Sequence, residues 1–437
     1  MTECTQESFD FPVCKRRRVE ATFDGGDITS DAGVLLLQQA DRRLGLSMAV
    51  AKALHDPRRR ASCAHGLDSL IRQRLFGLAL GYEDLNDHHT LRHDLALQTA
   101  VGQDNVLASA STLCRWENRT DRATAWRLHE VLVEQFIASF RRVPKRLILD
   151  FDATDDAVHG QQEGRFFHGY YDHYCFLPLY VFCGKQLLVS YLRPSKIIGA
   201  KHAWAILALL VKRLRQTWPK VRILLRADSG FCRWKMLRWC ERHSVDYLIG
   251  IATNKRLDAQ AKPFIDAAEQ HFQRTGRKQR RFHVMYYAAR TWDRRRRIIV
   301  KAEHTTQGSN PRYLVTNLKA QAQYLYDQLY CARGEMENRI KEQQLDLFAD
   351  RTSCHAWWPS QFRLLLSSLA YTLLEAIRRL ALDGTELANA YVGTIRLKLL
   401  KIGAVITRNT RRIRFLLSSA YPYQRLFAHV AARLQPA

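Results

Sequence analysis

Residues 147–154 have the sequence Leu147-Ile-Leu-Asp-Phe-Asp-Ala-Thr154, a short apolar run that ends in acidic residues. A second run of this kind, residues 221–228, ends in Asp228 and is followed by the turn residues Ser229 and Gly230. Short apolar runs bounded by turn residues are typical of buried β-strands. The sequence therefore predicts two buried strands that carry the carboxylates of Asp152 and Asp228 at their ends.

The segment around these two runs alternates between strand-like and helix-like patterns. We predict strands at 146–152, 174–183, 186–192, 221–227 and 245–251, and helices at 202–218 and 231–243. The resulting order, β-β-β-α-β-α-β, is that of the ribonuclease H-like fold. In that fold one acid lies on the first strand and another at the end of the fourth, which are the places of Asp152 and Asp228.

A third acid, Glu337, lies in a predicted long helix at 323–348. Helical residues three or four positions apart share a face, so one stripe of this helix carries Tyr330, Arg333, Glu337, Lys341 and Gln344. Glu335 is two residues from Glu337 and points elsewhere. Carboxylates on two strands and a packed helix can bind two divalent ions, one on each side of a phosphate. The three acids therefore predict a metal-dependent enzyme that cuts DNA.

The chain is strongly basic. Its 437 residues include 68 Lys and Arg against 42 Asp and Glu, a formal net charge of +26, and a polyanionic partner is the simplest explanation. The sequence contains no run of about 20 apolar residues and its first residues include acids, so we expect no membrane span and a cytoplasmic protein that joins the nucleoid when bound to DNA. The ten cysteines form no C-x-x-C pair, and we expect reduced thiols.

The chain divides into five predicted segments. Residues 1–140 are expected to form a mainly α-helical DNA-binding region, 141–251 the first part of the catalytic domain, 252–320 a basic β insertion, 321–350 the catalytic helix that completes the core, and 351–437 a C-terminal helical region with a hairpin at 404–418. The predicted fold class is an α/β ribonuclease H-like catalytic core with a β-strand-rich insertion, between two mainly helical regions.

Within the N-terminal region, a Ser/Thr cap precedes a short predicted helix that carries Arg115, Asn118 and Arg119. This mixture of residues suits a helix that reads bases in a DNA groove. An ordinary capped surface helix explains the pattern almost as well.

The insertion carries a run of four basic residues, Arg294, Arg295, Arg296 and Arg297. We expect this run to contact DNA phosphates. Three aromatic residues lie near this run: Tyr286, Tyr287 and Trp292. They either stack on exposed bases or form the core of a small sheet.

Several motifs together resemble one known family. They are Asp-Ala-Thr at 152–154, Asp-Ser-Gly-Phe at 228–231, the basic β insertion, and Tyr-x2-Arg-x3-Glu at 330, 333 and 337. The sequence is similar to the DDE transposases of bacterial insertion sequences, in the subgroup with a Tyr-x2-Arg-x3-Glu-x6-Lys signature. The chain departs from the signature at its last position, where Gln344 replaces the lysine and Lys341 lies one turn earlier.

The resemblance implies a cut-and-paste transposase that binds the terminal inverted repeats of its own element and then joins the ends to target DNA. It implies two Mg²⁺ ions, for which Mn²⁺ can substitute, held by Asp152, Asp228 and Glu337. It also implies double-stranded DNA as the partner, a homodimer or higher oligomer that pairs two ends, and phosphate contacts from Tyr330 and Arg333.

Three alternatives remain open from the sequence. Asp150 shares the strand face of Asp152 and could be the first metal ligand instead. The protein could also be a nuclease or resolvase on the same fold without joining activity. The third alternative is a non-enzymatic DNA-binding protein derived from a transposase.

Overall fold

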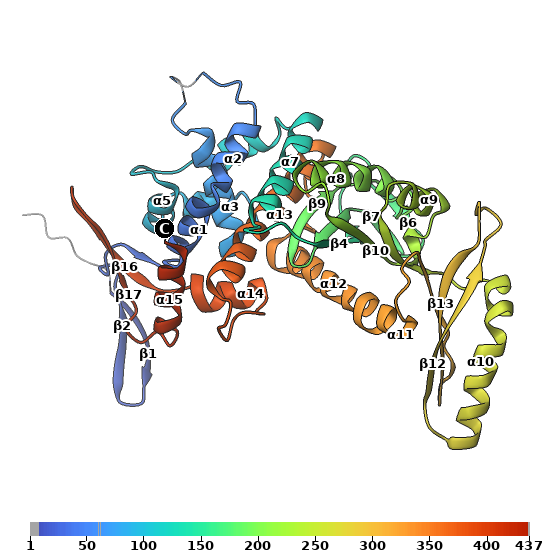
Figure 1. Cartoon of the computed structure of the whole chain (residues 1–437). Helices are drawn as coiled ribbons and strands as arrows, with labels where there is room; N and C mark the ends of the chain where they lie inside the picture. Colours follow the sequence, from blue (N-terminus) through green and yellow to red (C-terminus); the bar gives the residue numbers. More distant parts are fainter. Residues whose placement is uncertain (1–7, 60, 62, 436–437) are drawn as a thin grey trace, which may run out of the picture. The chain divides into compact units, whose positions relative to one another are not determined.

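A computed structural model describes residues 8–59, 61 and 63–435 of the chain (Figure 1). The chain folds into two compact units. One unit comprises residues 117–372, and the other combines residues 1–116 with residues 373–437. No helix in the described part of the chain is both long and apolar enough to cross a membrane.

The unit formed by 117–372 is built on a mixed β-sheet, which has nine strands among the described residues. The order is β12-β13-β15-β11-β10-β4-β8-β9, with β14 paired to β13. Strands β4, β10 and β11 are parallel, and every other pairing is antiparallel. The strands are β4 (Arg146–Ala153), β8 (Leu179–Cys183), β9 (Gln186–Tyr191), β10 (Arg222–Ala227), β11 (Asp246–Ile251), β12 (Gln279–Tyr287), β13 (Arg296–Thr305), β14 (Gly308–Ser309) and β15 (Arg312–Thr316).

The predicted strands at 146–152, 186–192, 221–227 and 245–251 are confirmed. The expected strand at 174–183 is instead two strands, β7 (His173–Phe176) and β8. Pro178 lies between them and has no N–H to donate to a sheet, which ends the pairing there. Strand β7 leaves the central sheet and joins β5 (Asp156–Ala157) and β6 (Phe166–His168) in a small three-stranded sheet.

Alternate residues of the central strands face opposite sides of the sheet. On one side, Leu149 and Phe151 of β4 join a large apolar core, which is closed by α7 (Arg122–Ala138), α8 (Ala203–Thr217) and α9 (Trp234–Arg242). Helices α8 and α9 confirm the predictions at 202–218 and 231–243. The acids at 150 and 152 occupy the alternate positions of β4 and therefore face the other side.

The other side of the sheet is covered by the helical segment 322–346. Leu325 and Leu329 of this segment pack on Leu224, Leu248 and Leu314 of the sheet. The segment begins as α11 (Ala322–Tyr324), continues through π-helical and 3₁₀ turns, forms α12 (Gly334–Lys341), and ends in a second π-helical turn at 342–346. The prediction of one regular α-helix at 323–348 is therefore wrong in detail, because π-helical turns shift the faces of the residues that follow them.

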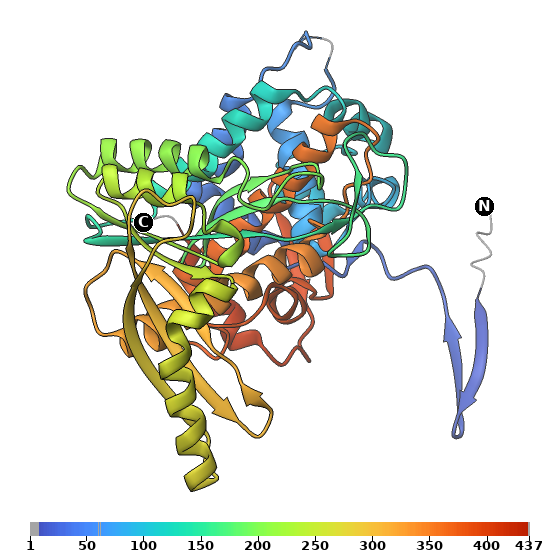
Figure 2. The ribbon, with the colours of Figure 1, turned by 90° about the vertical axis from the view of Figure 1, so that its right-hand side faces the viewer.

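Residues 252–320 do not form a purely β insertion, which corrects the prediction. They begin with α10 (Lys255–Thr275), a helix of 21 residues that lies beside β12 and β13 (Figures 1 and 2). The Asn254 side chain caps this helix by accepting from the N–H of Leu257, and Gly276 ends it with a left-handed backbone. Strands β13 and β15 then extend the central sheet at β11.

The second unit is mainly helical and combines the two ends of the chain. Its α-helices among the described residues are α1 (Val34–Leu44), α2 (Leu46–Ala53), α3 (Leu67–Leu80), α4 (His88–Leu91), α5 (Leu95–Val101), α6 (Ala110–Glu117, whose last residue belongs to the other unit), the end of α13 (Trp357–Ala381, whose residues up to 372 belong to the other unit), α14 (Val392–Ile395) and α15 (Gln424–Leu434). The predicted hairpin at 404–418 is confirmed as β16 (Ala404–Arg408) and β17 (Ile413–Leu417). Strand β3 (Ile28–Thr29) pairs with β16, while β1 (Phe9–Cys14) and β2 (Arg17–Ala21) form a separate hairpin.

Candidate active site

Two of the predicted acids lie at the ends of neighbouring parallel strands. Strands β4 and β10 pair in register, with Asp150 opposite Arg226 and Phe151 opposite Ala227. One further step along both strands places Asp152 beside Asp228, on the face that the helical segment 322–346 covers. Asp228 accepts a hydrogen bond from the N–H of Gly230 at 2.9 Å, which fixes the turn after β10.

Asp150 has a different environment from Asp152. Both of its carboxylate oxygens accept from the Arg226 guanidinium, at 2.5 and 2.7 Å, and both side chains are buried. Arg226 also donates to the backbone carbonyl of Leu329 in the helical segment. Asp150 therefore contributes to an ion pair that joins β4, β10 and the covering helix, and its oxygens are already engaged.

Arg333 links the acid of β4 to the acid of the helix. Its Nη2 lies 2.8 Å from Oδ2 of Asp152, and its Nη1 donates to Oε1 of Glu337 at 2.9 Å. Arg333 is nearly buried, whereas the Glu337 side chain is about half exposed. The arrangement brings together four of the residues that the sequence singled out, namely Asp152, Asp228, Arg333 and Glu337.

The surroundings of Asp152 raise its affinity for a proton. The pKa of Asp152 is raised to about 6, chiefly by burial and to a smaller extent by the negative charges of Asp228 and Glu337, while the positive charge of Arg333 opposes the shift. Burial lowers the pKa of Arg333, but the same acids outweigh it and the pKa is raised overall. The site therefore concentrates negative charge in a partly desolvated place, which favours a bound cation.

The donor set of this site fits Mg²⁺, because it consists of carboxylates with room for water and phosphate oxygens. In the described part of the chain no three His, Cys, Asp or Glu side chains converge closely enough to hold a metal ion as they stand. The Arg333 guanidinium lies between Asp152 and Glu337 and supplies the positive charge there. The Glu337 side chain is about half exposed, so the protein does not enclose its carboxylate.

Tyr330 lies against β11, the strand that pairs with β10. A Cβ atom on Gly250 of β11 would lie 2.7 Å from the Tyr330 hydroxyl and 2.9 Å from the backbone nitrogen of Ser229. Only glycine leaves space for this close approach. Gly250 is a site residue that the sequence reasoning missed, although a single glycine inside an apolar strand was the available signal.

Lys341 and Gln344 have different surroundings. Lys341 is exposed on α12. Gln344 lies in the π-helical turn, and its side-chain amide donates to the backbone carbonyl of Asp155 at 2.9 Å. Gln344 is therefore directed toward the chain that follows Asp152.

The basic run of the insertion divides into buried and exposed residues. Arg296 is buried and donates to both carboxylate oxygens of Glu241, at 2.8 and 2.9 Å. Arg297 donates to two backbone carbonyls. Arg294 and Arg295 are exposed, although Arg294 also contacts Glu241. The exposed pair is available to a polyanion, whereas Arg296 is held inside the protein.

The aromatics of the insertion are mostly internal. Tyr287 is buried and packs against Trp292 with ring centroids 5.7 Å apart, and only Tyr286 of the three is largely exposed. Of the three candidate base-reading residues, Arg115 lies on α6, whereas Asn118 and Arg119 follow its last residue in a turn, which corrects the prediction that one helix carries all three. All three are exposed. Position alone thus permits DNA contacts at this helix.

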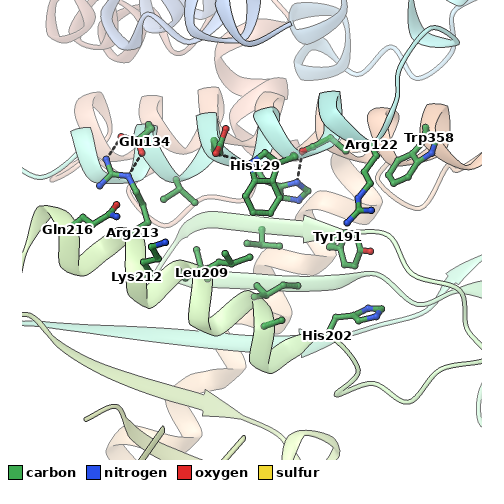
Figure 3. A pocket seen from close by; sticks show the side chains of 18 residues that line it. Arg122, His129, Glu134, Tyr191, His202, Leu209, Lys212, Arg213, Gln216 and Trp358 are labelled. Atoms are coloured by element: carbon green, nitrogen blue, oxygen red, sulfur yellow. Dashed lines mark hydrogen bonds and ion pairs between the residues drawn. The ribbon is translucent and has the colours of Figure 1, made fainter. Parts of the chain in front are cut away.

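A cavity of about 730 Å³ lies between α7 and α8, beside β9 (Figure 3). Its lining is mainly apolar, and the ion pair of Arg213 with Glu134 lies at one end while Trp358 lies at the other. None of the three acids lines it. This hollow is therefore separate from the acids.

Comparisons with known proteins assign the class. A model of the family described as "Transposase DDE domain group 1" matches residues 11–437, so the chain belongs to this family of DDE transposases. No protein with a curated description matches. Among solved structures, the piggyBac transposase synaptic complex with hairpin DNA aligns with a TM-score of 0.42 and 10% identity, over 94% of this chain and 86% of that chain.

Proposed function

We propose that this protein is an active DNA transposase that cleaves the ends of its insertion sequence and joins them to target DNA, with Asp152, Asp228 and Glu337 as the catalytic acids. The observation that carries the proposal is the placement of Asp152 and Asp228 at the ends of adjacent parallel strands, with Arg333 connecting Asp152 to Glu337. Binding of DNA alone would not need this arrangement of acids.

The strand order supports the same proposal. The run β9-β8-β4-β10-β11, in which only β8 opposes both of its neighbours, has the order 3-2-1-4-5 of a ribonuclease H-like core. The segment 252–320 follows the fifth strand and precedes the catalytic helix. These features correspond to the predicted catalytic domain, its insertion and its completing helix.

In the proposed phosphoryl transfer, the acids would bind the metal ions and Arg333 would bind the phosphate. Two Mg²⁺ ions would activate the attacking oxygen and stabilise the leaving oxygen when bound. Asp152, Asp228 and Glu337 would hold them, and Arg333 would turn its guanidinium from the carboxylates to the scissile phosphate as a charge-assisted donor. Tyr330 packs against Gly250 and so would set the distance between the helix and β11, the strand paired with the one that precedes Asp228.

The proposal is tested by single replacements of the acids by alanine. The expected result is loss of both cleavage and joining, with binding of the element ends largely retained, because phosphate contacts elsewhere supply most of the affinity. The substrate is DNA bearing the inverted repeats that flank the gene. Cleavage without joining by the unaltered protein would instead indicate a nuclease or resolvase, and binding without either reaction a non-enzymatic DNA-binding protein.

A salt titration separates affinity from sequence reading. Neutralising Arg294 and Arg295 should lower the salt dependence of binding, by a slope of about 0.9 for each phosphate that the protein no longer neutralises, without changing the preferred sequence. Changing Arg115, Asn118 and Arg119 should instead reduce discrimination between the element end and random DNA, by roughly 1–3 kcal/mol per base contact. Full discrimination by the second variant would exclude this helix as the reader. Size measurements on the DNA complex test the expected dimer or higher oligomer.

A further inference from the structure

A small hairpin near the candidate active site displays several aromatic side chains. Strands β6 and β7 pair with His168 opposite His173, and residues 169–172 form the tip. Tyr170 at the tip is 85% exposed, and Phe167 and Tyr174 on the strands are about half exposed. Aromatic side chains gathered in this way on one exposed element indicate an interaction surface.

The hairpin is connected to the strand that carries Asp152. Strand β5 begins at Asp156, separated by two residues from the end of this strand, and pairs with β7. His173 of β7 lies with Nε2 2.9 Å from Oδ2 of Asp155. Burial raises the pKa of Tyr171 to about 12, and the negative charges of Asp155 and Asp152 add to the shift. The hairpin is therefore tied, by the β5–β7 pairing and by the contact of His173 with Asp155, to the chain that follows Asp152.

The rings at the tip support one another. Tyr170 and Tyr171 meet edge to face with ring centroids 5.0 Å apart, and the Tyr171 ring lies 4.9 Å from that of His168. Tyr171 is partly buried while Tyr170 projects into solvent. This geometry leaves Tyr170 open to a further planar group.

Cations lie over the aromatic rings of the same hairpin. The Arg165 guanidinium is 4.5 Å from the ring centroid of Tyr174, and the Lys196 ammonium is 4.5 Å from that of Phe166. Basic groups interleaved with aromatic rings suit a nucleic acid, whose phosphates and bases need both. An apolar protein surface would gain nothing from these charges.

The base of the hairpin is anchored to the chain that follows the catalytic helix. The N–H of Glu163 donates to the carbonyl of His355 at 2.8 Å, and the Glu163 carboxylate accepts from the N–H of Trp357 at 3.1 Å. Gly164 has a φ of +82°, and a Cβ there would lie 2.7 Å from the Trp357 ring. The aromatic side chains are thus carried by an element fixed at both of its ends.

We propose that the β6–β7 hairpin is a stacking platform for unpaired nucleobases beside the scissile phosphate, with Tyr170 as the stacking side chain and Tyr171 as its support. The inference rests on the proposed function, since it assumes DNA at the site. It assigns base stacking to this hairpin and not to the insertion, where Tyr287 and Trp292 pack inward.

The test compares binding to a blunt duplex with binding to the same duplex carrying a short single-stranded thymidine overhang, without divalent cations so that no cleavage occurs. The unaltered protein should prefer the overhang. Tyr170→Ala should reduce this preference by about fivefold to a hundredfold while leaving affinity for the blunt duplex unchanged. Tyr170→Phe should keep the preference. Trp204→Ala, which removes a half-exposed aromatic from α8, is the matched control and should also keep it.

Unchanged overhang preference in Tyr170→Ala would overturn the platform, as would the absence of any preference in the unaltered protein. A change in oligomeric state with the preference intact would also overturn it, because the hairpin would then be a surface between protein copies. These results leave the proposed function standing if cleavage and joining persist. Failure of the unaltered protein to cleave would count against the proposed function alone.

Discussion

Replacing Asp152 by asparagine should make the metal-free protein more stable. Burial raises the pKa of this carboxyl from 3.8 to about 6, so the folded protein binds a proton that the unfolded chain releases. Stability from a raised carboxyl pKa is present at low pH and is lost as pH rises between these two values. Asparagine has nearly the shape of the protonated acid and does not ionise.

The size of the effect follows from the pKa. A difference of about two in pKa corresponds to roughly 3 kcal/mol, and the side chain is buried enough that solvent screening removes little of it. The gain from Asp152→Asn should therefore be about 3 kcal/mol near pH 8 and about half of that near pH 5. In a unit of this size, such a gain corresponds to a rise in melting temperature of roughly 6–12 °C near pH 8.

The assay is thermal unfolding with a chelator across this pH range, with the exposed Asp172→Asn as the control. Added Mg²⁺ should then raise the melting temperature of the unaltered protein more than that of Asp152→Asn, because one ligand charge is missing in the variant. Equal or lower stability of Asp152→Asn near pH 8 would refute the argument that the site holds a costly desolvated charge. Equal responses to Mg²⁺ would exclude Asp152 as a ligand.

Three further changes test the surroundings of the acids. Asp150→Ala should lower the free energy of unfolding by roughly 3–5 kcal/mol, since it leaves the buried Arg226 unpaired, and a smaller loss in chemical denaturation would show that the ion pair is not structural. Gly250→Ala should lower the free energy of unfolding by roughly 1–3 kcal/mol in chemical denaturation, because the new methyl group displaces the hydroxyl of Tyr330. The same displacement should slow DNA cleavage. Lys341→Ala should weaken strand transfer more than Glu335→Ala, because only Lys341 is one turn from Glu337 on α12, and equal effects in a joining assay would remove the case for Lys341 as the substitute lysine.

Local patterns in the sequence were sufficient for the strands that carry the acids. The apolar runs before Asp152 and Asp228 predicted β4 and β10 nearly to the residue, because a buried strand needs a continuous apolar stretch. The spacing of Arg333 and Glu337 also predicted that they share one face of the helix, since residues four apart on a helix are neighbours; their ion pair was not predicted.

Features that depend on pairing between distant segments could not be predicted in this way. The role of Asp150 is set by Arg226, which lies opposite it only through the parallel register of two strands separated by about 70 residues. The burial of Arg296 likewise depends on Glu241 of α9. Helix α10 is a different case. Its apolar residues Leu257, Ala261 and Ala268 have a helical spacing in the sequence, but the prediction for this segment followed its basic, strand-rich remainder and did not use that spacing.

The continuity of the central sheet has a mechanical consequence. Strand β15 is hydrogen-bonded on one side to β13 and on the other to β11, which is paired directly with the strand that ends at Asp228. A load applied to α10 or to the β12–β13 ribbon therefore passes through a ladder of backbone hydrogen bonds to the turn that holds Asp228, since close-packed interiors transmit strain. In the proposed function, a pull of bound DNA on this segment would therefore also act on the spacing of Asp152 and Asp228.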